Sequence, residues 1–141
     1  MASFTVVDSL RDDLADGRHN FASDTLRWAL TDTAPVVTDT VWSASAFPPP
    51  AAANGYPAGG GAITVTSSSQ TSGTYKLIIE DFTFTATAGG IGPFRYMVMY
   101  NDTSASNLLI GYADYGSELT LGNGETLLLD ASAANGILQI V

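Results

Sequence analysis

The stretch from Tyr75 to Asn101 constrains the fold more than any other part of the chain, because it holds the densest run of β-forming residues. It reads YKLIIEDFTFTATAGGIGPFRYMVMYN, with Ile, Thr and Phe frequent in the first half and Tyr, Val and Met in the second. Such side chains favour strands, and the AGGIGP segment between the two halves is typical of a turn. The pattern predicts a long β-hairpin.

The apolar face of the first arm changes partway along it. Up to Ile79 the apolar residues stand mainly at odd positions, whereas Phe82 and Phe84 stand at even positions. Because the side chains of a strand alternate between two faces, this switch requires a bulge or a move to another sheet. We therefore expect a kink at Glu80 and Asp81, as where a strand passes between the sheets of a β-sandwich.

The composition favours a single acidic domain. The chain has 141 residues, no cysteine and a formal net charge of −9, from 14 acidic and 5 basic residues. This length is typical of one domain, residues 1–141, that buries its core without disulfides. The few Lys and Arg residues are scattered, and no apolar run reaches the roughly 20 residues of a membrane span. We expect neither nucleic acid nor a membrane as a partner.

The N-terminal arm, residues 1–20, is expected to contain the helix. Its apolar residues recur at spacings of three and four, as on one face of a helix: Phe4, Val7, Leu10 and Leu14. Ser3 or Asp8 is a suitable N-cap, and Gly17 is a suitable residue to end the helix. The pattern predicts one short amphipathic helix within this arm.

Metal-binding and cofactor-binding sites are not expected. Asp12, Asp13 and Asp16 lack the spacing of a calcium loop and are expected to lie mostly on the solvent face of the helix. His19 is the only histidine, and with no cysteine present it cannot complete a zinc site. We expect a structural or exposed position for His19, no metal and no cofactor.

No catalytic residues are predicted. The GxSxG motif of a serine hydrolase is absent, and His19 stands alone near the N-terminus. Paired carboxylates could serve a glycosidase, and six acidic residues are candidates by type only: Glu80, Asp81, Asp114, Glu118, Glu125 and Asp130. The first two are adjacent and face opposite sides of a strand, and the others stand next to turns, where solvated acids are common. We expect that the protein is not an enzyme.

Further strands are expected on both sides of the hairpin. Thr25–Leu30 alternates as in a half-buried strand, and later segments show similar patterns: Ala62–Ser68, Asn107–Tyr115, Glu118–Leu121, Glu125–Ala131 and Ile137–Val141. The pair Asn-Gly occurs at 123–124 and 135–136 and is a strong hairpin signal, so the chain is expected to end in a meander. These short strands predict an all-β fold, an antiparallel β-sandwich or jelly roll with one short N-terminal helix.

The segment 31–61 is the most irregular part of the chain, with most of the prolines and a run of three glycines. Val36–Ser43 is expected to form at most a short edge strand, and Pro48–Pro50 cannot join a ladder. A solvated linker seldom carries as much apolar surface as this segment, whose residues of this kind are Val41, Trp42, Phe47 and Tyr56. Two interpretations remain open: these side chains pack back onto the sandwich, or they dock on another subunit.

Three blocks of the sequence resemble a known family. They read SDTLRWALTDTAP, YPAGGG and GPFRYMVMYND, and the likeness extends over most of the chain. The chain resembles small virion proteins that are encoded by tailed bacteriophages and prophages. The resemblance implies a structural protein made in the bacterial cytoplasm. A small all-β member without enzymatic residues looks most like a capsid cement or decoration protein. That role implies a jelly-roll or related sandwich, a homo-oligomer (dimer or trimer), and attachment to the major capsid protein on the outer capsid surface.

Two other roles in a virion remain open. A tail or head-fibre component could bind a receptor or a sugar, with aromatic side chains as stacking platforms: Trp42, Tyr56, Tyr100 and Tyr112. A tail-tube subunit would also be rich in strands. The acidic charge suits the outside of a capsid better than its DNA-filled lumen, where anionic surfaces would repel each other.

Contacts with the capsid or with a sister subunit are expected from the parts of the chain that regular strands do not use. These parts are the N-terminal arm and the segment 31–61. The candidate interface residues are Phe4, Val41, Trp42, Phe47 and Tyr56, because aromatic residues in loops are frequent interface anchors. The turn around Gly89–Pro93 is the next candidate.

Overall fold

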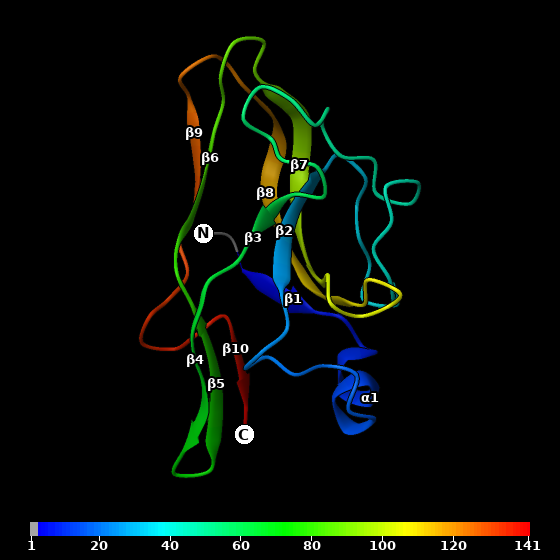
Figure 1. Cartoon of the computed structure of the whole chain (residues 1–141), viewed down its shortest axis with the longest axis vertical. Coiled ribbons are helices and arrows are strands. Elements are labelled where there is room, and N and C mark those ends of the chain that lie inside the picture. The colour runs from blue at the N-terminus through cyan, green and yellow to red at the C-terminus, as the bar shows by residue number, and fades with distance from the viewer. Residues whose placement is uncertain (1–2) are drawn as a thin grey trace.

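The computed structural model describes residues 3–141 (Figure 1). It consists mostly of antiparallel strands, and the described part of the chain contains one helix, α1 (Leu10–Ala15). The strands form three sheets, of five, three and two strands. The prediction of a mostly β fold with one short helix near the N-terminus is confirmed. Within residues 3–141, no helix is long and apolar enough to span a membrane.

The largest sheet has the strand order β1-β8-β7-β2-β3. Its members are β1 (Phe4–Val6), β2 (Leu26–Thr31), β3 (Gly61–Ala62), β7 (Ile91–Asn101) and β8 (Leu109–Leu121). The expected first strand appears as β2, which pairs with β7 along its whole length. Five of its six residues are buried, so β2 is covered on both faces rather than on one.

The two smaller sheets follow one another along the long axis of the molecule (Figure 1). One has the order β10-β5-β4 and the other pairs β6 with β9. Their members are β4 (Val65–Thr71), β5 (Thr74–Ile79), β6 (Phe82–Thr85), β9 (Thr126–Leu129) and β10 (Leu138–Ile140). Apolar residues of all three sheets belong to one buried cluster, which forms the core.

The hairpin predicted for Tyr75–Asn101 does not form. The kink at Glu80 and Asp81 is confirmed, because the chain leaves one small sheet after β5 and enters the other at β6. However, β5 pairs with β4 and β10, β6 pairs with β9, and β7 pairs with β8 and β2. The period-two pattern correctly identified strands and their faces, but it does not specify which strand is the neighbour.

The N-terminal arm contains a strand that the helix pattern concealed. Phe4–Val6 pairs with β8, and α1 begins only after Ser9. Gly17, with φ +71°, follows the end of α1, as expected for the residue that ends a helix. The predicted helix was too long because apolar residues three and four apart also fit a strand, a turn and a short helix in succession.

The prediction of a C-terminal meander is also wrong. β8 is one continuous strand where two were expected, and β9 and β10 pair with β6 and β5 instead of with each other. The Asn-Gly pairs at 123–124 and 135–136 do lie in turns, with positive φ at Gly124 and Gly136. These turns connect different sheets, so the local turn signal was right and the inferred pairing was not.

Candidate interaction surface

The long segment between β2 and β3, residues 32–60, covers the free edge of β2. β3 pairs with only two residues of β2, so the rest of that edge lacks a neighbouring strand. The phenol oxygen of Tyr56 accepts a hydrogen bond from the backbone N–H of Leu30 at 3.1 Å. The hydroxyl of Thr31 donates to the carbonyl oxygen of Pro48 at 3.1 Å. The segment therefore completes the edge of β2 with hydrogen bonds that involve side chains.

Phe47 and Tyr56 belong to the protein's own core. Each is 3% exposed, and the Tyr56 ring stacks on Phe84 of β6 with the ring centroids 5.6 Å apart. Burial raises the pKa of Tyr56, and the hydrogen bond from Leu30 opposes that shift. For these two residues the packing interpretation is correct. The expectation that they anchor an interface is corrected, because their side chains leave no surface for a partner.

Trp42 is half-buried against Tyr100 of β7. The two rings are nearly parallel, at an interplanar angle of 6°, with centroids 4.4 Å apart. The phenol of Tyr100 also donates a hydrogen bond to the carbonyl oxygen of Gly59 at 2.6 Å. Tyr100 therefore contacts two distant parts of the segment, at Trp42 and at Gly59. Burial raises the pKa of Tyr100 to about 12, and the Asp102 carboxylate adds to the shift. Trp42 therefore contributes to intramolecular packing and has only its outer side available to a partner.

Phe4 occupies a similar intermediate position in β1. Its ring contacts the edge of Trp28 in β2, with centroids 5.9 Å apart and an interplanar angle of 86°. It also lies directly over Gly111 of β8, where a Cβ atom would come 2.5 Å from the Phe4 ring. Phe4 thus packs across the large sheet and is only partly exposed.

Val36, Val37 and Val41 are exposed apolar residues of the long segment, and we call these three residues the valine strip. Their exposed fractions are 52%, 38% and 39%. Val36 donates its backbone N–H to the Asp39 carboxylate at 2.7 Å, which closes a local turn. Of the five residues that the sequence identified as interface candidates, Val41 is the exposed one, and its two neighbours in the strip were missed.

The backbone of the valine strip is fixed to the large sheet. The N–H of Asp8 donates to the carbonyl oxygen of Val37 at 2.8 Å. Val41 makes an isolated antiparallel bridge with Leu108, so the edge strand expected at Val36–Ser43 is reduced to a single bridge. An apolar strip with exposed side chains and a fixed backbone can contact a partner at little cost in conformational entropy.

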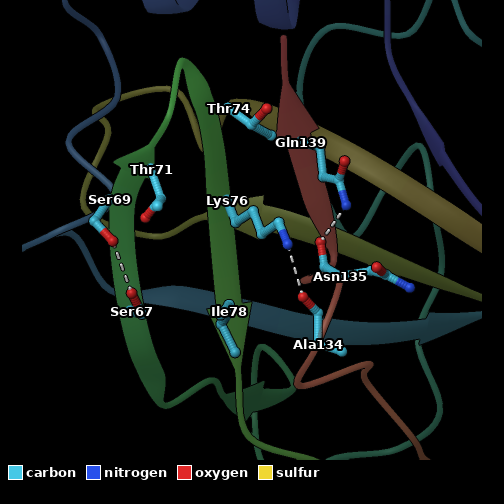
Figure 2. A pocket seen from close by; sticks show the side chains of 9 residues that line it. All are labelled: Ser67, Ser69, Thr71, Thr74, Lys76, Ile78, Ala134, Asn135 and Gln139. Carbon is cyan, nitrogen blue, oxygen red and sulfur yellow. Dashed lines mark hydrogen bonds between the residues drawn. The ribbon is translucent and has the colours of Figure 1, made fainter.

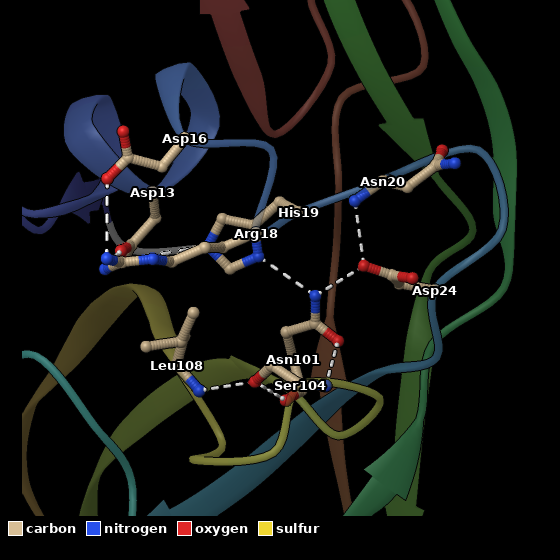
Figure 3. Close-up of polar contacts among 9 residues, drawn as sticks. All are labelled: Asp13, Asp16, Arg18, His19, Asn20, Asp24, Asn101, Ser104 and Leu108. Atoms are coloured by element: carbon tan, nitrogen blue, oxygen red, sulfur yellow. Dashed lines mark hydrogen bonds and ion pairs between the residues drawn. The ribbon is translucent and has the colours of Figure 1, made fainter.

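A buried polar cluster connects the N-terminal arm to the end of β7 (Figure 3). The amide nitrogen of Asn101 lies 2.9 Å from His19 Nδ1 and donates to the Asp24 carboxylate at 2.7 Å. Asp13 is 2% exposed and accepts a hydrogen bond from Arg18 at 2.9 Å. The expectation that Asp13 lies on the solvent face is wrong, because the short helix turns this carboxylate inward toward His19 and Arg18.

His19 has a structural position, which confirms one of the two positions expected for it. Its side chain has no exposed surface, and Nε2 lies 3.9 Å from the Asp13 carboxylate. Burial lowers the pKa of His19, while the nearby Asp13 and Asp24 carboxylates oppose this shift. An enclosed imidazole of this kind can stabilise the arm.

Three of the six acidic candidates for catalysis, Asp81, Asp114 and Glu125, are engaged in other contacts. Asp114 accepts two hydrogen bonds from Arg95, at 2.9 and 3.1 Å, and these bonds hold the pKa of Asp114 below its usual value. The Glu125 side chain accepts a hydrogen bond from the backbone N–H of Gly122 in a turn. Among residues 3–141, no group of three or more His, Cys, Asp and Glu residues is placed to hold a metal ion.

A polar groove of about 610 Å³ lies on the three-stranded sheet (Figure 2). Its lining consists mainly of hydroxyl and amide side chains with one ammonium group: Ser67, Ser69, Thr71, Thr74, Lys76, Ile78, Ala134, Asn135 and Gln139. Lys76 donates to the carbonyl oxygen of Ala134 at 2.9 Å, so its charge is partly engaged. No pattern in the sequence indicated this groove, because its residues come from β4, β5, and a turn and β10 more than 50 positions later.

A signal for the missed valines was present in the sequence. Val36 and Val37 are adjacent and follow Pro35, without the alternation that would place one of them inside a sheet. The buried cluster around His19 had no such signal, since its members come from the arm and from β7. Comparison with models of protein families found no match to this chain, and searches of curated proteins and of solved structures found none either.

Proposed function

We propose that the protein is a structural component of a tailed-bacteriophage virion, and that it is a cement protein bound to the major capsid protein on the outer surface of the shell. The three sequence blocks that resemble small virion proteins support this proposal, as does the net charge of −9, which suits the outside of a capsid. The shared core of the three sheets supports the related proposal that they form a sandwich of the jelly-roll kind.

The observation that carries the cement function is the valine strip. The segment that contains it has two charged residues, Asp32 and Asp39, in a strongly acidic chain. Its aromatic residues are used inside the protein, whereas Val36, Val37 and Val41 are left exposed. A surface of low charge with exposed apolar side chains on a fixed backbone is suited to a site repeated many times on a capsid.

A charge placed in the valine strip tests this function. The double substitution Val36→Asp and Val41→Asp should weaken binding to purified capsids by about 2 kcal/mol or more, because a buried, unpaired charge opposes the contact. Leu128→Asp is the matched control, since Leu128 is 54% exposed on β9, away from the strip. Binding by co-sedimentation and folding by circular dichroism would be measured for each variant. A folded double variant that binds capsids as well as the parent would refute the role of the strip.

The polar groove supports a second candidate function, a sugar-binding or receptor-binding module of a tail or head fibre. Its hydroxyl and amide groups are suited to hydrogen bonds with a sugar. Counting copies in purified virions separates the functions, because a cement protein should approach the copy number of the major capsid protein and a fibre component should not. Imaging of the particle would identify the remaining alternative, an abundant tail-tube subunit.

A further inference from the structure

β4 is the longest strand at an edge of any of the three sheets. It spans seven residues and pairs only with β5. The other edge strands, β1, β3, β6, β9 and β10, have between two and four residues. Short edges are one way in which proteins avoid pairing with other chains, and β4 does not use it. In Figure 1, β4 and β5 project at the lower end of the molecule, with β10 on the other side of β5.

The hydrogen-bonding groups on the outer edge of β4 can be assigned from the pairing. Ser68 is opposite Leu77 of β5, and the Leu77 carbonyl accepts a hydrogen bond from Ile137, on the β10 side of β5. Ser68 is therefore a non-hydrogen-bonded position of the β4–β5 ladder, and Gln70 is the next one by alternation. The backbone N–H and C=O groups of Ser68 and Gln70 point away from β5, toward the free edge.

The composition of this edge does not block pairing. β4 reads VTSSSQT, without charge or proline, which are the usual means of blunting an edge. The bulge of the β4–β5 ladder lies between Val65 and Ser67, so the part from Ser67 to Thr71 is regular. It ends in a two-residue turn with positive φ at Ser72 (52°) and Gly73 (84°), as in a type I′ hairpin.

We propose that two copies of this chain pair through β4, antiparallel, about a two-fold axis at Ser69. In this register Ser68 of each copy is opposite Gln70 of the other, so the outward N–H and C=O groups bond in both directions. Ser67 of one copy is then opposite Thr71 of the other, and the Ser69 residues of the two copies are opposite each other. The two three-stranded sheets become one continuous six-stranded sheet. This inference does not depend on the proposed capsid function.

The lack of charge on β4 permits a second copy to approach there, and charge favours the antiparallel over the parallel arrangement. Each chain carries a net charge of −9, so two copies can approach closely only where their surfaces lack acids. β4 provides such a surface. Glu80, the acidic residue at the end of β5, lies near the Val65 end of β4. An antiparallel pair places this end beside the neutral turn at Ser72 and Gly73, whereas a parallel pair would place the two Glu80 residues at the same end of the joined sheet.

A single introduced cysteine tests the register, because the native chain has none. Across the proposed axis the two Ser69 residues form a non-hydrogen-bonded pair with Cα atoms about 4.5 Å apart, which permits a disulfide. Under mild oxidation, Ser69→Cys should become a covalent dimer, seen on a non-reducing gel. Ser67→Cys is the matched control. Its two copies would be four residues out of register, about 13 Å apart, and should remain monomers.

The mass of the protein in solution provides an independent measurement. The unmodified chain should behave as a dimer by light scattering. Ser69→Lys, which places two ammonium groups opposite each other at the axis, should shift the mass to that of one chain while the circular dichroism spectrum is retained. A monomeric parent protein would overturn the proposal. So would a dimer in which Ser69→Cys forms no disulfide, or in which Ser67→Cys cross-links equally well.

Discussion

In the long segment 32–60 the side chains are more deeply buried than the irregular backbone suggests, and in the β4–β5 hairpin they are less buried than the regular backbone suggests. The segment has almost no regular structure, yet Phe47 and Tyr56 are buried in the core and Gly60 lies so close to β2 that a Cβ atom there would overlap the Trp28 carbonyl oxygen. The hairpin is regular, yet all seven residues of β4 are exposed or only partly buried. Burial therefore follows the chemistry of the side chains and not the regularity of the backbone.

This difference separates two kinds of contact. In the segment, the apolar side chains serve the protein's own stability, and only the valine strip is left for a partner. In the hairpin, the ladder with β5 requires little from the side chains of β4, so its outer edge remains available for hydrogen bonds to another strand. The segment is expected to influence both folding and binding, and the outer edge of the hairpin to influence mainly association.

The largest expected effect is on the segment's core residue Phe47. Phe47→Ala should lower the free energy of unfolding by about 3–5 kcal/mol, because it leaves a cavity where a buried ring was packed. Ser69→Ala in the hairpin should change the free energy of unfolding of the single chain by less than about 0.5 kcal/mol. Urea unfolding followed by circular dichroism measures both, on samples dilute enough to be monomeric. A small effect of Phe47→Ala would mean that the segment is not part of the folding core.

The positions of these aromatic residues show what could be predicted from the sequence. Their number in the segment 31–61 indicated that the segment was not a solvated linker. Their burial depends on neighbours distant in sequence, such as Phe84 beside Tyr56 and Tyr100 beside Trp42. A pattern along the chain records which residues are apolar, but not whether the surface they cover is the protein's own.

The same limit applies to the strands. The kink at Glu80 and Asp81 was predictable because it is a change in local periodicity. The partners of β5, β6 and β7 were not, because every strand with an apolar face is compatible with several neighbours. The buried position of Asp13 was equally hidden, since its ion pair with Arg18 and its proximity to His19 arise from the turn that follows α1.

A smaller loss of stability is expected at alkaline pH, and it involves Tyr100, whose phenol holds the segment. The pKa of Tyr100 is raised to about 12 from 10.0, so the folded state favours the neutral phenol. The stability from this shift is complete below pH 10.0 and is lost as the pH rises toward 12, because the unfolded chain ionises first. Tyr56, whose pKa is also raised, acts in the same direction. Unfolding free energies measured at a series of pH values would show the decrease.

The control for this pH dependence is Tyr100→Phe. It lacks the hydrogen bond to Gly59 and should be less stable at neutral pH by about 1 kcal/mol. It also lacks the ionising group, so the stability difference from the parent should shrink as the pH rises above 10.0. A difference that stays constant across this range would mean that Tyr100 does not control the alkaline sensitivity of the segment.

The smallest expected effect is in the turn of the hairpin. Ser72 has φ +52°, a conformation that costs energy for most residues but is well tolerated by asparagine, and Asn-Gly is the preferred pair of a type I′ turn. Ser72→Asn should therefore raise the free energy of unfolding by about 0.5 kcal/mol, measured by urea unfolding of dilute protein. Ser69→Asn is the matched control, because asparagine is disfavoured within a strand and should give no gain. Equal gains at both positions would show that the hairpin responds to the residue type and not to the geometry of its turn.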